Sequence, residues 1–206
     1  MSSKGVSAAE TTAFLRTLFA ASVAAHEKFA SSSLQALATA AEAIGQSLRS
    51  GGKVLAFGNG GSASDAQHLV AELVGRFEGE RRALPAIALT ADSNVVTAIS
   101  NDYGYDRVFV RQIEGLGQPG DVAFGISTSG RSPNVIAALT AAKSRGLITI
   151  ALTGRDGGPM GAGADIHLHV AEEATPRVQE VHRTILHAMC SLIDRELQVE
   201  DEKGRM

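Results

Sequence analysis

The sequence predicts an α/β protein with a five-stranded parallel sheet flanked by helices. Two observations support this fold class: short, continuous apolar runs recur after residue 53, and a helical stretch separates each run from the next. Strands that are buried on both faces have continuous apolar runs, whereas half-exposed strands alternate with polar residues. Strands that alternate with helices along the chain pair in parallel within one sheet.

Two helices are expected before the sheet. Thr11–Ala30 and Ser33–Leu48 carry apolar residues and alanines at helical spacing. The serines at 31–33 are expected to cap the second helix, and Gly51-Gly52 to end it.

The five strand candidates are the apolar runs that follow, at 53–58, 85–90, 121–127, 147–153 and 165–170. Helices are expected between them at Ser62–Val74, at Ser93–Ile113 and from Pro133 onward, where the missing N–H of proline is not needed. A long final helix, Thr175–Leu197, has an apolar stripe. Without a break in composition, residues 1–206 are predicted to form one domain, with N-terminal helices at about 11–50 and an α/β core at about 53–197.

Composition argues against several classes of function. With 19 Lys and Arg against 22 Asp and Glu, the net charge is −3, so no basic surplus favours nucleic acid or an anionic membrane as a partner. Aromatic residues make up 4% of the chain, too few for base-stacking surfaces. Cys190 is the only cysteine, which excludes an intrachain disulfide and cysteine-cluster metal sites. Without a signal peptide or an apolar span, the chain is expected to be soluble and cytoplasmic.

Two loops have the composition of an anion site. GNGGS at 58–62 and STSGRS at 127–132 each follow a predicted strand and precede a helix. Ligands of open parallel sheets bind at the carboxyl ends of strands, where helix N-termini expose N–H groups. Hydroxyls and N–H groups with little formal charge suit a phosphate monoester. The alternative for either loop is that its hydroxyls only cap helices, but two such loops in one sheet favour phosphate.

The first loop also matches a dinucleotide-binding pattern, because Gly58, Gly60 and Ala63 satisfy G-x-G-x-x-A. The acidic residue that should bind the ribose about 20 residues further on is missing, since Arg81 and Arg82 lie there instead. A nicotinamide-dependent enzyme is therefore disfavoured.

Ionisable residues cluster on two predicted helices. His68 and Glu72 are four residues apart and share a helix face, with Asp65 three residues before His68, so this group can hold a metal or move protons. A simple surface hydrogen bond is the alternative. On the final helix, Gln179 and His187 are roughly 80° apart and can border one cleft. His187 lies in an apolar stretch, where an imidazole needs either a ligand or a backbone partner.

Taken together, these motifs resemble the sugar isomerase (SIS) domain family. The matching segments run in order from about Thr11 to Leu197 and are GNGGSASDAQHLVAEL at 58–73, SND at 100–102, STSGRSPN at 127–134, ALTG at 151–154 and RVQEVHRTILHAMC at 177–190. Within the family they are similar to the branch that isomerises sedoheptulose 7-phosphate. The resemblance implies a parallel five-stranded sheet flanked by helices and a homotetramer with its sites near subunit contacts.

The resemblance also implies which residues form the site. The expected phosphate-binding residues are Ser62, Ser127, Thr128, Ser129 and Ser132. The other expected substrate-binding residues are Asn59, Gly60, Gly61, Glu72, Asn101, Asp102 and Gln179. One zinc ion per subunit is expected on His68, Glu72, Gln179 and His187.

The implied reaction converts sedoheptulose 7-phosphate into D-glycero-D-manno-heptose 7-phosphate through an enediol, in the synthesis of heptose for lipopolysaccharide or related glycans. Glu72 is the expected base and His187 the expected acid, with Asp65 as a further candidate for proton transfer.

A non-catalytic relative is the main alternative. Some SIS proteins are tetramers that bind the bacterial replication initiator, and Arg76–Leu89 also resembles that group. Because Glu72 and His187 are both present and are expected only in the isomerase, the sequence favours the enzyme.

Overall fold

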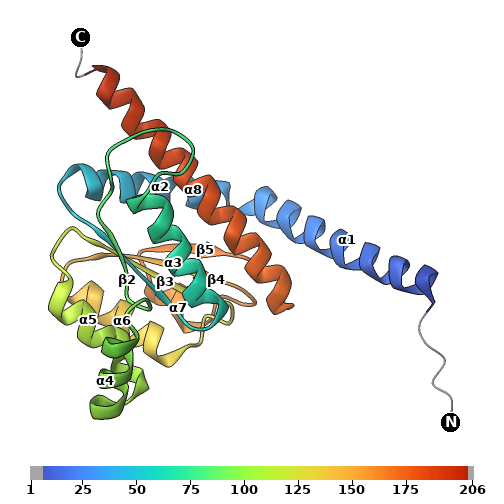
Figure 1. Ribbon diagram of the computed structural model, residues 1–206, viewed down its shortest axis with the longest axis horizontal. Helices are drawn as coiled ribbons and strands as arrows, with labels where there is room; N and C mark the ends of the chain where they lie inside the picture. The colour runs from blue at the N-terminus through green and yellow to red at the C-terminus, as the bar shows by residue number, and fades with distance from the viewer. Residues whose placement is uncertain (1–6, 204–206) are drawn as a thin grey trace.

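The computed structural model describes residues 7–203, which form a five-stranded parallel sheet with helices on both faces (Figure 1). The strands are β1 Val54–Gly58, β2 Ala86–Ala88, β3 Val122–Ser127, β4 Ile148–Thr153 and β5 Ile166–His169. They lie in the order β2-β1-β3-β4-β5, and every pairing is parallel. The predicted fold class is confirmed.

The helices alternate with the strands as the sequence predicts. The helical segments are α1 Ala8–Ser32, α2 Leu34–Arg49, α3 Gly61–Val74, α4 Ser93–Tyr103, the 3₁₀ turn η1 Tyr105–Arg107, α5 Val108–Leu116, α6 Pro133–Ser144, α7 Gly158–Gly163 and α8 Thr175–Lys203. Within residues 7–203, no helix is long and apolar enough to cross a membrane.

The strand order reverses between β1 and β3. From β1 the chain moves outward to β2 and then returns to place β3 on the other side of β1. The register pairs Gly58, the last residue of β1, with Ile126 of β3, so the two following loops emerge side by side. Ligands of open α/β sheets bind at such a reversal, and both predicted anion loops lie there.

Each face of the sheet has its own apolar core. On one face, α2, α3 and α8 pack on residues such as Ala56 and Phe124. On the other face, α5, α6 and α7 pack on residues such as Phe57 and Ala151. This double burial explains why the strands appear in the sequence as continuous apolar runs.

The helix α1 extends away from the body of the molecule (Figure 1). It begins with a capping box, in which Ser7 and Glu10 satisfy one another's backbone N–H groups. Of its residues only Ala25 and Phe29 are buried. Ser33 occupies the N-cap position of α2, but the predicted cap is wrong in detail, because its side chain makes no capping hydrogen bond.

Three elements differ from the sequence prediction. The strand expected at 85–90 is limited to Ala86–Ala88 at the sheet edge. The helix expected over Ser93–Ile113 ends at Gly104, where a 3₁₀ turn intervenes before α5. The short helix α7 was not predicted, because its GPMGAG sequence has poor helix propensity and the helix is held by the burial of Met160 and Gly161.

His182 lies in the core between α8 and the sheet and is fully buried. Burial lowers its pKa to about 4, and the Thr153 backbone opposes this only in part. The unfolded chain, with a histidine pKa of about 6.5, therefore binds more protons than the folded chain as the pH falls from 6.5 towards 4.

We therefore expect His182 to destabilise the protein in mild acid. Linkage predicts that this residue removes about 2 kcal/mol from the free energy of unfolding between pH 7 and pH 5. Urea denaturation at both pH values should show a smaller loss of stability in His182→Leu than in wild type. Equal losses in the two proteins would contradict this assignment.

Candidate active site

The loops after β1 and β3 are joined by side-chain hydrogen bonds. Asn59, in the first loop, and Asn134, in the first turn of α6, exchange two hydrogen bonds, with Nδ2 to Oδ1 distances of 2.9 and 3.0 Å. The hydroxyl of Tyr105 donates to Oδ1 of Asn59 at 2.9 Å. These contacts fix the first loop relative to the second. The polar ends of Asn59 are thus engaged with protein groups.

Hydroxyl groups line the loop after β3. Ser127 Oγ lies 2.9 Å from Ser132 Oγ and 3.4 Å from Ser129 Oγ. Ser132 is the N-cap residue of α6, yet its side chain makes no capping hydrogen bond and faces Ser127 instead. The alternative in which these hydroxyls only cap a helix is therefore not supported at Ser132. The half-buried Thr128 belongs to the same loop. Ser62, at the start of α3, lies close to Gly58, the residue that pairs with Ile126 of β3.

We call residues 127–132 the hydroxyl loop. The neighbouring α7 segment packs against this loop and supports it. Gly130 has a φ of +64°, and a Cβ on it would lie 2.1 Å from the carbonyl oxygen of Gly157. The Met160 N–H donates to the Gly130 carbonyl oxygen at 3.2 Å. Only glycine allows both the backbone conformation and this close approach.

The helices α3 and α8 pack in parallel, and a row of polar residues lies between them, which we call the α3–α8 seam. The seam residues of α3 are spaced four, three and four apart and are Gly61, Asp65, His68 and Glu72. Those of α8 are spaced four apart and are Gln179, Arg183 and His187. Such spacings place side chains on one face of a helix. The seam begins beside the first loop, where α3 starts.

The contacts across the seam form successive layers, each made by residues of α3 and α8 at the same height. The first layer pairs Gly61 with Gln179, and the second pairs Asp65 with Arg183. A Cβ on Gly61 would lie 1.8 Å from Gln179 Nε2, so the amide of Gln179 rests directly on the glycine backbone. Arg183 forms an ion pair with Asp65 at 2.7 Å, and the Asp65 side chain is only 5% exposed. These contacts hold the first turns of the two helices together.

The next layer brings together the predicted acid, base and metal ligands. Nε2 of His68 lies 2.7 Å from Nε2 of His187 and 3.5 Å from Oε1 of Glu72. One imidazole donates to the other, and the ring of Phe77 lies against His187. Part of this group reaches solvent, because the side chains of His68 and Glu72 are 28% and 22% exposed.

Burial in the seam shifts two pKa values, and neighbouring charges modify both shifts. Burial lowers the pKa of His68, the charges of Arg183 and His187 lower it further, and Glu72 opposes them. His68 therefore favours its neutral form, the form that binds metals. Burial raises the pKa of Asp65, although the ion pair with Arg183 opposes this rise.

Not all the predicted site residues come together. Asn101 and Asp102 are exposed on α4, where Nδ2 of Asn101 donates to Oδ1 of Asp102 at 2.8 Å. Within residues 7–203, neither is recorded in a hydrogen bond or ion pair with a predicted site residue outside this pair. The described residues also contain no group of three His, Cys, Asp or Glu side chains arranged for metal binding.

Sequence reasoning missed three residues at the site: Tyr105, Asn134 and Arg183. Arg183 could have been found from its spacing, since it lies four residues from both Gln179 and His187. Tyr105 and Asn134 gave no such signal, because their contacts with Asn59 join segments 46 and 75 residues apart.

The fold and the position of this site define a doubly wound α/β protein whose ligand site lies where the strand order reverses. The family model described as the SIS domain matches residues 18–154, and the chain belongs to the SIS domain family. Phosphoheptose isomerase of Geobacter sp. (strain M21) is 54% identical over 162 residues, or 79% of this chain and 84% of that protein. Phosphoheptose isomerase of Aliarcobacter butzleri (strain RM4018) is 57% identical over 152 residues, or 74% and 80% of the two chains.

Solved structures are similar over almost the whole chain. Phosphoheptose isomerase from Neisseria gonorrhoeae has a TM-score of 0.85 and 46% identity, covering 90% of this chain and 99% of that one. A phosphoheptose isomerase from Francisella tularensis has a TM-score of 0.87 and 38% identity, covering 90% and 98%.

Proposed function

We propose that this protein is an aldose-ketose isomerase that converts sedoheptulose 7-phosphate into D-glycero-D-manno-heptose 7-phosphate. The observation that carries the proposal is the contact of His68 with both His187 and Glu72 in the α3–α8 seam, which begins at the loop after β1. The relatives named phosphoheptose isomerase support the substrate. Cytoplasmic heptose synthesis for lipopolysaccharide or a related glycan is the corresponding cellular role.

The hydroxyl loop binds the end of the substrate that does not react. Ser127, Thr128, Ser129 and Ser132, with Ser62, donate hydrogen bonds to the phosphate oxygens. The N-termini of α3 and α6 add favourable dipoles. The sugar chain then extends along the seam towards Glu72 and His187. Gln179, which rests on Gly61 near the start of this path, bonds to sugar hydroxyls.

Isomerisation moves one proton between two neighbouring carbons. A carboxylate oxygen of Glu72 removes a proton from C1 of the open-chain ketose, and the imidazole of His187 protonates the C2 oxygen to give the enediol. Glu72 then returns the proton to C2, and the neutral imidazole of His187 takes the hydroxyl proton from O1, which gives the aldose. Asp65 is a further candidate for proton transfer, since burial raises its pKa.

The seam side chains match a zinc ion in ligand type, although the described residues do not form a preformed cluster of three ligands. Two imidazoles and a carboxylate are the ligand types of catalytic zinc sites, and His68, His187 and Glu72 lie together here. These three residues and Gln179 would hold one ion per subunit. When bound, zinc acts as a Lewis acid towards the substrate oxygens. The carboxylate of Glu72 has two oxygens and would therefore be able to serve both as a ligand and as the proton acceptor.

The base role predicts a large effect of Glu72→Gln. Removal of a general base lowers kcat by about 10²–10⁴-fold, and we expect a loss of this size with sedoheptulose 7-phosphate, followed by coupled phosphorylation of the aldose. Glu80→Gln is the matched control, because Glu80 is exposed and lies outside the seam. Full activity in Glu72→Gln would remove the assigned base.

The zinc site predicts a change in metal content. Protein prepared without chelators should contain about one zinc per chain, and His68→Ala should lose it because a ligand is removed. His169→Ala is the control, since His169 lies on β5 and bonds to the Arg155 carbonyl oxygen. Elemental analysis that finds equal zinc in both variants would refute the site.

The non-catalytic alternative is not favoured. A SIS tetramer that only binds a replication initiator has no need for His68 to contact both a carboxylate, Glu72, and a second imidazole, His187. A well-folded wild-type protein that forms no aldose product would support that alternative.

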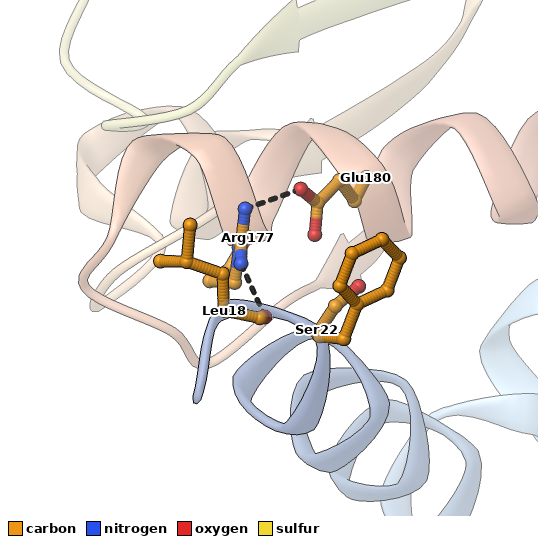
Figure 2. Close-up of a pocket in the computed structure, with 5 residues that line it drawn as sticks. Leu18, Ser22, Arg177 and Glu180 are labelled. Carbon is orange, nitrogen blue, oxygen red and sulfur yellow. Dashed lines mark hydrogen bonds and ion pairs between the residues drawn. The ribbon is translucent and has the colours of Figure 1, made fainter. Parts of the chain in front are cut away.

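We also propose a homotetramer in which α1 contacts other subunits. Phe14, Leu15, Leu18, Phe19 and Val23 are 38–74% exposed on α1. Exposed apolar surface of this extent marks an interaction site. Figure 2 shows how α1 is held for this role: Arg177 of α8 donates to the Leu18 carbonyl oxygen and to Glu180, each at 2.5 Å.

The assembly can be tested by light scattering. Phe14→Glu combined with Phe19→Glu places charges on the apolar stripe and should shift a tetramer to smaller species, because burying an unpaired charge is unfavourable. Ala20→Glu lies on the opposite side of α1 and should leave the assembly intact. A monomeric wild type would disprove the homotetramer.

A further inference from the structure

The guanidinium of Arg81 is buried at the C-terminal end of α3. The side chain is 5% exposed and belongs to the segment 75–85 that joins α3 to β2. Its Nη2 donates to the Glu72 carbonyl oxygen at 2.7 Å, and its Nη1 donates to the Leu73 and Arg82 carbonyl oxygens at 2.9 and 3.0 Å. The last carbonyls of a helix lack partners within it and attract cations. Arg81 therefore fixes the last turn of α3 from outside the helix.

The same guanidinium also holds α8. Nε of Arg81 donates to Oδ1 of Asp194 at 2.6 Å. Asp194 lies seven residues after His187, so both side chains project from the same face of α8, two turns apart. One buried side chain thus joins the backbone of Glu72 to the helix that carries His187.

Stability alone does not account for this ion pair. The other carboxylate oxygen, Asp194 Oδ2, is buried and has no hydrogen-bond partner among the described residues. A buried ion pair is often no more stabilising than a well-packed apolar pair of similar volume. An arginine, however, has a rigid planar fork that can bond several acceptors in fixed directions. The contacts of Arg81 use that property, because they reach a carboxylate and three carbonyl oxygens.

We propose that Arg81 is a positioning residue for proton transfer, which sets the distance between the Glu72 carboxylate and the His187 imidazole. The inference rests on the proposed isomerase function. Proton transfer between fixed groups requires placement within about 0.5 Å. Glu72 lies in the last turn of α3, where helices fray, so its placement depends on an external contact.

The test compares Arg81→Lys and Asp194→Asn with wild type, at a temperature where each variant is folded by circular dichroism. Lysine keeps the charge but cannot bond all four acceptors, and asparagine keeps the shape of Asp194 without its charge. We expect kcat to fall about 10–100-fold, as for other residues that orient a reacting group. KM should stay within about twofold, because the phosphate binds to the loops after β1 and β3 and not to this end of α3.

Asp121→Asn is the matched control. Asp121 forms another buried ion pair, with Lys53 at 2.6 Å, but this pair lies at the amino ends of β1 and β3, away from the site. Its loss should lower stability without changing kcat. An unchanged kcat in both test variants, or an equal fall in the control, overturns the proposal.

Hydrogen exchange separates this proposal from the proposed function. Amides at 70–75 should exchange faster in Arg81→Lys than in wild type, while those of β1 should not. If wild type forms no aldose, the isomerase assignment fails, and exchange alone decides whether Arg81 holds the helix end. Equal exchange at 70–75 in the two proteins overturns the proposal whatever the activity.

Discussion

The parallel packing of α3 against α8 is the interaction on which the site depends. Each layer of the seam has members from both helices, and the partners advance together, from Gly61 with Gln179 to His68 with His187. The smallest residue lies in the first layer, so the helices approach closely there, and this approach sets the separation of the later layers. A larger side chain at the first layer would move every layer beyond it.

The sheet decides where the seam begins. The helix α3 starts three residues after the end of β1, so this short connection fixes the first seam residue relative to the strand end. The exchange of hydrogen bonds between Asn59 and Asn134 ties the same point to α6. The loop after β3 and the start of the α3–α8 seam are thereby connected, although α6 and α3 lie on opposite faces of the sheet.

Local pattern was enough to predict the strands, most of the helices and the stripe of His68 and Glu72. It failed where packing, not propensity, forms the structure. Half of the residues of helix α7 are glycines, and the helix forms because Met160 is buried against the sheet. The contact of His68 with His187 spans 119 residues, so no local spacing could show it; the resemblance to the SIS family placed the two together. The position of Asn101 and Asp102 on an exposed helix was also not foreseeable from spacing.

The hydroxyl loop carries little net charge, which affects how it would bind the phosphate ester of substrate and product. The one cationic residue among 127–132, Arg131, forms an ion pair with Asp156 at 2.5 Å, so its charge is offset by that carboxylate. Hydroxyls hold a phosphate ester by directional bonds without a strong field, and the ester is the same before and after isomerisation. In the proposed isomerase, this loop therefore contributes equally to the binding of substrate and product and favours neither direction of the reaction.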